Sequence, residues 1–278
     1  MKHLIITGAY GLVGSNFTFP SDWKITRIKF NEIPDCEPAD YIIHAAGYGQ
    51  PSKFTNDKIA TIAVNTTTTI ELFKKLKKDG TFLFVSTSEV YSGATPPYKE
   101  TDIGTTTPEH PRACYIEAKR CGEAICHAYQ EQGYNVKIAR LGLGYGAGTK
   151  KGDGRVLHQF IERALEDYNV FSCMGDGSAT RNYIYIKDAT YLMFKILTEG
   201  KQTVYNVGGI EKVSIKGLGQ MIAELTGKIF VTTPDNRSIK EAPQDVQLAM
   251  WNTLGEFPIA FTPLFEGLKE TIKWQKSL

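Results

Sequence analysis

The stretch HLIITGAYGLVGSN (residues 3–16) decides the expected fold of this 278-residue chain. Residues 3–7 form an apolar run that is typical of a buried strand. Gly8, Gly11 and Gly14 follow at once, and we expect them to open a helix. Glycines at this spacing allow a tight turn, so that backbone amides at the helix start hold a pyrophosphate. The stretch predicts a dinucleotide site; a turn that is merely well packed is the alternative.

Strand-like and helix-like segments alternate over the first two-thirds of the chain. The expected strands are residues 3–7, 24–30, 40–46, 81–86, 136–141 and 203–207, and the expected helices are residues 59–78, 115–132, 153–167 and 187–199. This alternation predicts a Rossmann-like doubly wound α/β fold, with a mostly parallel sheet and helices on both faces. We expect residues 1–205 to bind mainly the cofactor, residues 142–180 to contribute to the substrate cleft, and residues 206–278 to form mainly a small cap.

The composition is that of an ordinary globular protein, with 42% hydrophobic residues, 22% charged residues and a net charge of +2. The basic run at residues 74–78 is expected on a solvated helix rather than in a nucleic-acid site. The chain enters a strand pattern at once, so we expect no signal peptide, and its apolar runs are too short to predict a membrane span. Five cysteines without CxxC spacing predict reduced thiols, no metal site and a cytoplasmic location.

The segment that should hold the adenosine is short. Only roughly 26 residues separate Gly14 from Asp40, where a helix, a strand and a second helix are usual. Pro20 cuts the first helix short, and the usual acidic residue for the ribose is missing. Asn31 and Glu32 are weak substitutes, and Arg27 and Lys29 on the second strand favour an extra phosphate if they face it. We expect an abbreviated, loose site for NAD, with NADP as the alternative.

A second motif lies in RACYIEAKRCGEAICHAY (residues 112–129). Tyr115 and Lys119 are four residues apart and share one face of a helix. A lysine beside a phenol stabilises the phenolate and lowers its pKa, so that tyrosine becomes a general base for a sugar hydroxyl. A solvated Tyr–Lys pair without function is the alternative.

A third motif, FLFVSTSEVY (residues 82–91), is a buried strand that ends in Ser86, Thr87, Ser88 and Glu89. Ligands of open parallel sheets bind at this end of the strands. The three motifs together resemble the extended short-chain dehydrogenases/reductases that modify nucleotide sugars. DYIIHAA (40–46), VNTTTTIELFKKL (64–76), GDGSATRNYIYIKDA (175–189) and FTPLFEGLKETIKW (261–274) are similar to further segments of that family. STSEVY, PRACY followed by KR, and DGRV are most similar to its UDP-glucuronate decarboxylases.

The resemblance implies a role for each candidate residue. The implied catalytic residues are Thr87, Ser88, Glu89, Tyr115 and Lys119. The implied cofactor contacts are Gly8, Tyr10, Gly11, Leu12, Val13, Gly14, Ala45, Ala46, Gly47, Asn65, Ser86, Tyr115 and Lys119. The implied substrate contacts are Glu89, Arg155 and Arg181, and the two arginines could instead be surface ion-pair residues.

The implied reaction begins when Tyr115 takes the proton of the sugar 4-hydroxyl and NAD takes the C4 hydride. The resulting β-keto acid loses CO₂, C5 is protonated and the hydride returns. The implied partners are a nucleotide sugar and a second copy of the chain, bound through the helix of Tyr115.

Two departures keep other functions open. Leu143 stands where the decarboxylases carry an asparagine, and the cofactor half is shortened. The related 4,6-dehydratases carry Asp-Glu in place of Ser88-Glu89, and the 4-epimerases usually lack the glutamate. The alternatives are therefore a 4-epimerase, a 4,6-dehydratase or a 4-ketoreductase of the same fold, or an inactive dinucleotide-binding protein.

Overall fold

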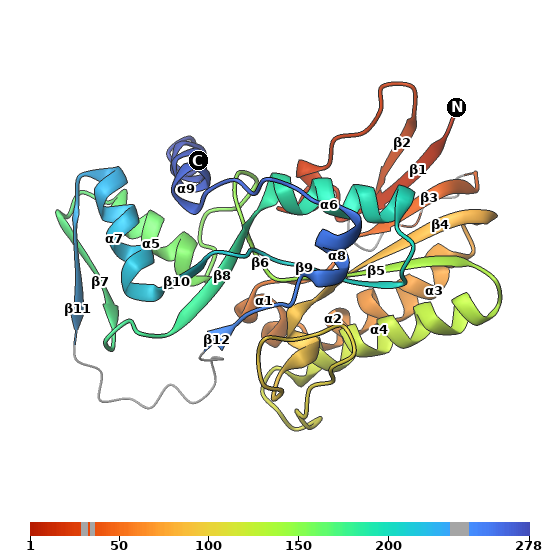
Figure 1. Cartoon of the computed structure of the whole chain (residues 1–278), viewed down its shortest axis with the longest axis horizontal. Coiled ribbons are helices and arrows are strands. Elements are labelled where there is room, and N and C mark those ends of the chain that lie inside the picture. Colours follow the sequence, from red (N-terminus) through yellow and green to blue (C-terminus); the bar gives the residue numbers. More distant parts are fainter. Residues whose placement is uncertain (29–32, 34–36, 234–244) are drawn as a thin grey trace.

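The computed structural model describes residues 1–28, 33, 37–233 and 245–278. Its larger half is a six-stranded sheet (Figure 1) in the order β2-β1-β3-β4-β5-β9, with every pair of neighbours parallel. The strands are β1 (His3–Thr7), β2 (Lys24–Ile28), β3 (Ala39–His44), β4 (Leu76–Thr87), β5 (Asn135–Leu141) and β9 (Val204–Val207). The strand order reverses at β1, which places a ligand crevice beyond the ends of β1 and β3. The predicted doubly wound parallel sheet is confirmed.

Helices cover both faces of this sheet. The helices α1 (Pro51–Asn56), α2 (Lys58–Asn65), α3 (Thr67–Phe73) and α4 (Ala113–Glu131) lie below the sheet in Figure 1, and α6 (Ile186–Glu199) lies above it. Side chains of β4 alternate between the two layers, because successive residues of a strand point to opposite faces. Phe82 and Phe84 belong to the core that includes α3 and α4, and Leu83 and Val85 to the core that includes α6.

The predicted helix over residues 59–78 is wrong. It is divided at Thr66 into α2 and α3, and it ends at Phe73. Threonine hydroxyls at 66 and 69 bond to carbonyls four residues back, a contact that competes with regular helix geometry. The basic run therefore leaves the helix: Leu76 opens β4 beside Ala39, and Lys77 pairs with Asp40 at 2.9 Å.

The glycine-rich loop also departs from the prediction, because it does not open an α-helix. A single 3-10 turn, η1 (Gly14–Asn16), follows β1. Aromatic side chains pack where a helix was expected. Trp23 stacks on Tyr41, with ring centres 4.7 Å apart, and Phe19 and Trp23 both contact Phe194 of α6. The predicted strand 24–30 is β2 up to Ile28, and Lys29, Asn31 and Glu32 lie outside the described residues.

The smaller half has a core of its own around Phe160, Phe171, Leu218 and Leu268. Its elements are β6 (Leu143–Tyr145), α5 (Val156–Ala164), β7 (Val170–Met174), β8 (Thr180–Tyr185), β10 (Lys212–Ser214), α7 (Ile215–Thr226), β11 (Ile229–Thr233), β12 (Asp245–Val246) and α9 (Leu264–Gln275). The helix α8 (Trp251–Glu256) instead packs near β9 of the large sheet. The division at residue 205 stays a prediction.

Candidate active site

The end of β4 and the first turns of α4 bring the predicted catalytic residues together. Thr87 is the last residue of β4, and its hydroxyl accepts a hydrogen bond from Glu89 N (3.2 Å) at the start of η2 (Ser88–Tyr91). The same hydroxyl bonds to the phenol of Tyr115. Lys119, one helical turn further on, donates to Val85 O at 2.7 Å. Thr87, Tyr115 and Lys119 therefore occupy one compact site, with Ser88 buried beside them.

Tyr115 does not have the lowered pKa that the sequence suggested. Its ring is 8% exposed and stacks on Phe54 at 4.8 Å. Burial and the Glu89 carboxylate together raise the pKa of the Tyr115 phenol to about 12, although the hydrogen bond from Thr87 opposes them. Lys119 points its ammonium at Val85 O, so the lysine stabilises the strand end rather than the phenol in this structure.

Lys119 is a buried ammonium, only 4% exposed. Burial lowers the pKa of Lys119 to about 8, and the neighbouring carboxylate of Glu123 opposes that shift. The ammonium also lies 4.8 Å from the centre of the Phe84 ring. At neutral pH this lysine therefore still carries its charge, beside the crevice at the strand ends.

Arg112 is a site residue that sequence reasoning missed. Its guanidinium donates to the Glu89 carboxylate and lies 5.3 Å from the centre of the Phe54 ring, the ring that stacks on Tyr115. Burial raises the pKa of Glu89, and the charge of Arg112 opposes the shift. Arg112 stands three residues before Tyr115 inside PRACY, and this spacing was the sequence signal that Arg112 lies near the phenol. A glutamate–arginine pair thus borders the phenol.

The cofactor side of the site is built around glycines and one unpaired amide oxygen. At Gly8, with φ +65°, a Cβ would lie 2.5 Å from Ala45 O, so the β1 and β3 loops touch through backbone. A Cβ on Gly47 would lie 3.8 Å from Lys119 Nζ and 3.9 Å from Asn65 Oδ1. That Asn65 oxygen is buried and has no hydrogen-bond partner among the described residues. A polar ligand beside Gly47 would satisfy it, so these residues fit the ribose and amide groups of a nicotinamide dinucleotide.

The remaining predicted cofactor residues lie around the same two loops. Tyr10 is exposed, Leu12 and Val13 are partly buried, and Ala46 donates its N–H to Thr7 Oγ1 at 3.2 Å. Ser86 differs from these, because its hydroxyl donates to Glu123 behind the strand and the residue is only 3% exposed. The assignment of Ser86 to the cofactor stays a prediction without a contact on the crevice side.

The two predicted substrate arginines approach one tyrosine of the small half. Arg155, just before α5, forms a bidentate pair with Asp153, at 2.7 and 3.0 Å. Arg181 lies on β8, two residues before Tyr183. Burial raises the pKa of Tyr183 to about 12, and the charges of Arg181 and Arg155 oppose the rise. Arg155 acts in the same direction on Tyr115, so Arg155 lies within electrostatic range of the phenol. The assignment of Arg181 to the substrate stays a prediction.

Leu143 lies in the same region, because β6 runs parallel to β8 with Leu143 opposite Tyr183. In the parts of the chain that the structure describes, no group of three or more histidine, cysteine, aspartate or glutamate side chains is arranged to hold a metal ion. Every described helix is too short or too polar to cross a bilayer. Cys114, Cys121, Cys126 and Cys173 are free thiols, while Cys36 lies outside the described residues.

Comparison with known proteins adds the family. A decarboxylase of Danio rerio, UDP-glucuronic acid decarboxylase 1, is 32% identical over 84% of this chain and 57% of its own length. A dTDP-4-dehydro-6-deoxy-D-allose reductase of Streptomyces is 24% identical over 99% of this chain and 96% of its own length. The chain spans about half the length of the UDP-glucuronic acid decarboxylases of Danio rerio, Xenopus tropicalis and Arabidopsis thaliana that it resembles. The solved structure of RMD from Pseudomonas aeruginosa, complexed with NADPH, covers 100% of both chains with a TM-score of 0.82 at 22% identity.

Residues 23–208 match the model of a whole family, and this range starts after the shortened glycine-rich loop. The family is NAD dependent, which confirms the predicted cofactor. The match extends over β2 to β9 and thus includes the sheet, the end of β4 and the helix of Tyr115. The chain belongs to the NAD dependent epimerase/dehydratase family.

Proposed function

We propose that this protein is an NAD-dependent decarboxylase of UDP-glucuronate. The observation that carries the proposal is the Glu89–Arg112 pair beside the buried phenol of Tyr115. An anionic sugar needs a cation near its carboxylate, and Arg112 reaches Glu89 through Nη2 only. Its buried Nε has no hydrogen-bond partner among the described residues, so the guanidinium keeps a donor for a second carboxylate. The similarity to UDP-glucuronic acid decarboxylases over 84% of the chain supports the same substrate.

The residues divide the chemistry between them. NAD, when bound, accepts the hydride from C4 of the sugar and later returns it. Tyr115 takes the 4-hydroxyl proton, with Thr87 bonded to its oxygen. Because burial raises the pKa of this phenol, the positive charge of the nicotinamide ring of NAD would have to lower it for the phenolate to form. The C5–C6 bond of the 4-keto acid then breaks, and its electron pair passes into an enolate as CO₂ leaves. Glu89, whose pKa burial raises, is the residue we assign to protonation at C5: it takes up a proton from water and passes it to C5, and Tyr115 returns its own proton to the 4-oxygen.

The test is incubation of the purified protein and NAD with UDP-glucuronate and with other UDP-, dTDP-, CDP- and GDP-sugars, followed by mass spectrometry. A product lighter by one CO₂ from UDP-glucuronate alone supports the proposal. Loss of one water from any sugar identifies a dehydratase, and an unchanged mass with an altered sugar configuration identifies an epimerase. Either of these outcomes overturns the decarboxylase.

A 4-ketoreductase is the second candidate, and the shortened nucleotide half favours it. A decarboxylase regenerates its cofactor in every cycle, so tight binding costs it nothing. A reductase must exchange its cofactor after each turnover, and a loop that gives one 3-10 turn instead of a helix suits exchange. The full-length similarity to a dTDP-sugar reductase points the same way. Consumption of stoichiometric NADH or NADPH with a 4-keto sugar would establish this alternative.

We also propose that the protein forms a homodimer through α2, α3 and α4, in a cytoplasmic setting. Ile59, Ile62 and Ile70 are 77%, 41% and 38% exposed on α2 and α3, and α2 packs along α4. Two of the exposed residues of α4, Cys121 and Ala124, are small, which leaves room for a second helix pair to approach at that point. Sedimentation of the wild type as a dimer and of Ile62→Glu as a monomer would support this interface, and a monomeric wild type would overturn it.

A further inference from the structure

A buried ion pair joins the helix of Tyr115 to the strand that carries Thr87. The hydroxyl of Ser86 donates to Glu123 Oε1, and Glu123 lies on α4, one turn after Lys119. Arg140 on β5 donates to both oxygens of Glu123, with Nη2 2.7 Å from Oε2. The Arg140 and Glu123 side chains are 12% and 8% exposed. Among the described residues, neither side chain forms a hydrogen bond with Tyr115 or Lys119.

The contact between Ser86 and Glu123 is one of three that join β4 to α4. Three consecutive residues of β4 hold three residues of α4 that are one turn apart. Thr87 meets Tyr115, Val85 O accepts from Lys119, and Ser86 donates to Glu123. Because residues four apart share one face of a helix, a shift of α4 along β4 would break all three contacts together.

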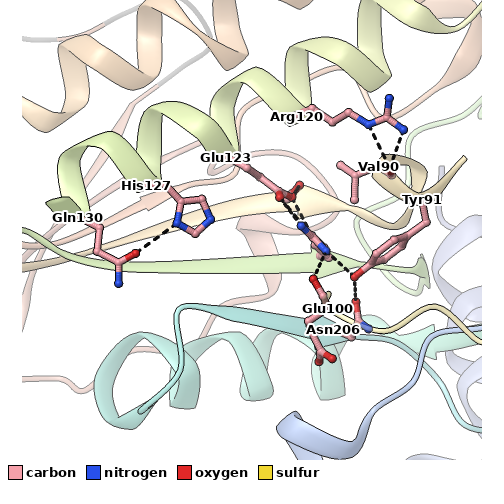
Figure 2. A network of polar contacts seen from close by, with 10 residues as sticks. Val90, Tyr91, Glu100, Arg120, Glu123, His127, Gln130 and Asn206 are labelled. Atoms are coloured by element: carbon pink, nitrogen blue, oxygen red, sulfur yellow. Dashed lines mark hydrogen bonds and ion pairs between the residues drawn. The ribbon is translucent and has the colours of Figure 1, made fainter. Parts of the chain in front are cut away.

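The guanidinium that holds Glu123 is itself fixed on its other side. Its Nη1 donates to Tyr91 Oη and to Glu100 O, both at 2.8 Å, and Tyr91 donates in turn to Asn206 Oδ1 (Figure 2). Figure 2 also shows Arg120 of α4 bonding to Val90 O, in the turn after Glu89. Glu123 is thus tied to the turn that begins with Ser88 and Glu89.

The packing of α4 leaves little freedom for a different position. A Cβ on Gly122 would lie 2.4 Å from Phe84 Cζ and 2.7 Å from Asn65 O, so α4 sits against β4 and α2 at a distance that only glycine permits. A buried carboxylate in such a contact costs desolvation free energy, which a well-packed apolar pair would avoid. That cost suggests a role beyond packing.

We propose that Glu123 is a positioning residue, which through Ser86 and Arg140 fixes the register of α4 on β4 and so places Tyr115 and Lys119 at the end of the strand. The inference rests on the proposed function only in that Tyr115 acts as the base and Lys119 binds the cofactor. Glu123 touches neither cofactor nor substrate in this assignment.

The electrostatic consequence concerns Lys119. The charged or titratable groups around its ammonium are Glu123 and Cys126 on α4 and His44 on β3, and Arg140 faces Glu123 from β5. His44 is neutral, because burial lowers its pKa to about 3. The carboxylate of Glu123 is the leading group that opposes the fall in the pKa of Lys119. Without it that pKa drops below about 8, and the ammonium is lost at a lower pH than in the wild type.

The test measures NAD binding by calorimetry, which needs no sugar substrate. For Glu123→Gln we expect an NAD Kd within about 2-fold of wild type at about pH 6.5 and about 10-fold weaker at about pH 8.5, since one pKa unit corresponds to a tenfold change. With UDP-glucuronate, kcat should fall by about 10-fold or more while KM changes less, the scale of a displaced base. Glu117→Gln is the matched control, because Glu117 is a carboxylate on the same helix that pairs with Arg120 and not with β4. It should match wild type at both pH values.

Lys119→Gln distinguishes a failure of the proposed cofactor role of Lys119 from a failure of the positioning role of Glu123. If Lys119→Gln leaves the NAD Kd unchanged at both pH values, the cofactor role of Lys119 in the proposed function fails. If Lys119→Gln weakens NAD but Glu123→Gln follows the wild-type pH dependence, the positioning role of Glu123 is overturned. Should Glu123→Gln fold poorly, the double variant Glu123→Gln/Arg140→Gln leaves no unpaired buried charge and is read in the same way. Ser86→Ala should show a smaller loss of kcat, and a wild-type kcat there would also count against the register contact.

Discussion

Around the end of β4, Thr87, Glu89 and Lys119 each have a hydrogen-bond or ion-pair partner, whereas after β1 the chain replaces a helix with one turn and a group of rings. The two regions meet across the same crevice, because β1 and β4 both flank β3 in one parallel sheet. The first region depends on side chains held in register, and the second depends on backbone geometry at Gly8 and Gly14.

The difference teaches which part of a dinucleotide site can shrink. A pyrophosphate is held by backbone amides, so the loop tolerates the loss of the helix body behind it. Proton transfer requires a defined distance between a phenol oxygen and a sugar hydroxyl, and a displacement of about 1 Å can reduce the rate about 10²-fold. The catalytic region therefore keeps its full framework, while the adenosine region does not.

The largest expected effect concerns the catalytic region. Tyr115→Phe should lower kcat by about 10²-fold or more, since it removes the general base and leaves the ring stacked on Phe54. Folding and the NAD Kd should stay close to wild type. Tyr129→Phe is the control, because Tyr129 lies on the same helix but stacks on Phe73 in the core. A near-normal kcat in Tyr115→Phe would remove this residue from the chemistry.

The next effect concerns the rings that replace the helix. Trp23→Ala should lower the free energy of unfolding by about 2 kcal/mol, less than for a fully buried tryptophan, because Trp23 is half-buried against Tyr41 and Phe194. Urea unfolding followed by circular dichroism measures it. Trp251→Ala, at a side chain 74% exposed, should change the stability by less than about 0.5 kcal/mol. Equal effects of the two substitutions would show that the rings do not replace the missing helix.

A smaller effect is expected on the substrate side. Arg181→Lys keeps the charge but loses the planar fork, so kcat/KM should fall by about 10-fold. Arg163→Lys, on the exposed side of α5, should behave as wild type and serves as the control. Steady-state kinetics with the sugar identified in the mass assay would distinguish them. Kinetics of Arg181→Lys that match wild type would make Arg181 a structural residue.

The smallest effect concerns cofactor choice. The NAD Kd should exceed that of a full-length nucleotide half. The preference for NAD over NADP should be less than about 10-fold, because the sequence offers only Asn31 and Glu32, weak substitutes for the usual carboxylate, to discriminate the 2′-hydroxyl. Calorimetric titration with both cofactors measures the ratio. Tight NAD that stays bound through purification would reveal an adenosine pocket built by other residues.

The sequence predicted much of the large sheet, because its strands are apolar runs bounded by turn residues. The ends of β1, β3, β5 and β9 differ from the expected limits by at most two residues. That a 3-10 turn replaces the expected helix after Gly14 could not be predicted in the same way. Whether Phe17, Phe19 and Trp23 pack as an extended segment depends on Phe194 of α6, which lies far along the chain.

In the site, the spacing of Tyr115 and Lys119 was informative, since four residues make one helical turn. The pKa of Tyr115 was not predictable, because it depends on how deeply Phe54 and the rest of the fold bury the ring. The three-residue spacing between Arg112 and Tyr115 was a signal for Arg112, but its partner, Glu89, lies 23 residues earlier in the chain and could not be predicted from that spacing. Sequence patterns report local periodicity, and long-range ion pairs leave no trace in it.

The return of the C-terminal chain to the large sheet has a consequence for biosynthesis. Leu248, Met250 and Phe257 are buried in the same core as Leu4 and Ile6 of β1. A ribosome that adds about 5–20 residues per second makes the first strand long before these last core residues. The large half therefore stays open at this corner until residues 248–257 have left the ribosome. Nascent chains of this protein should bind chaperones up to that point.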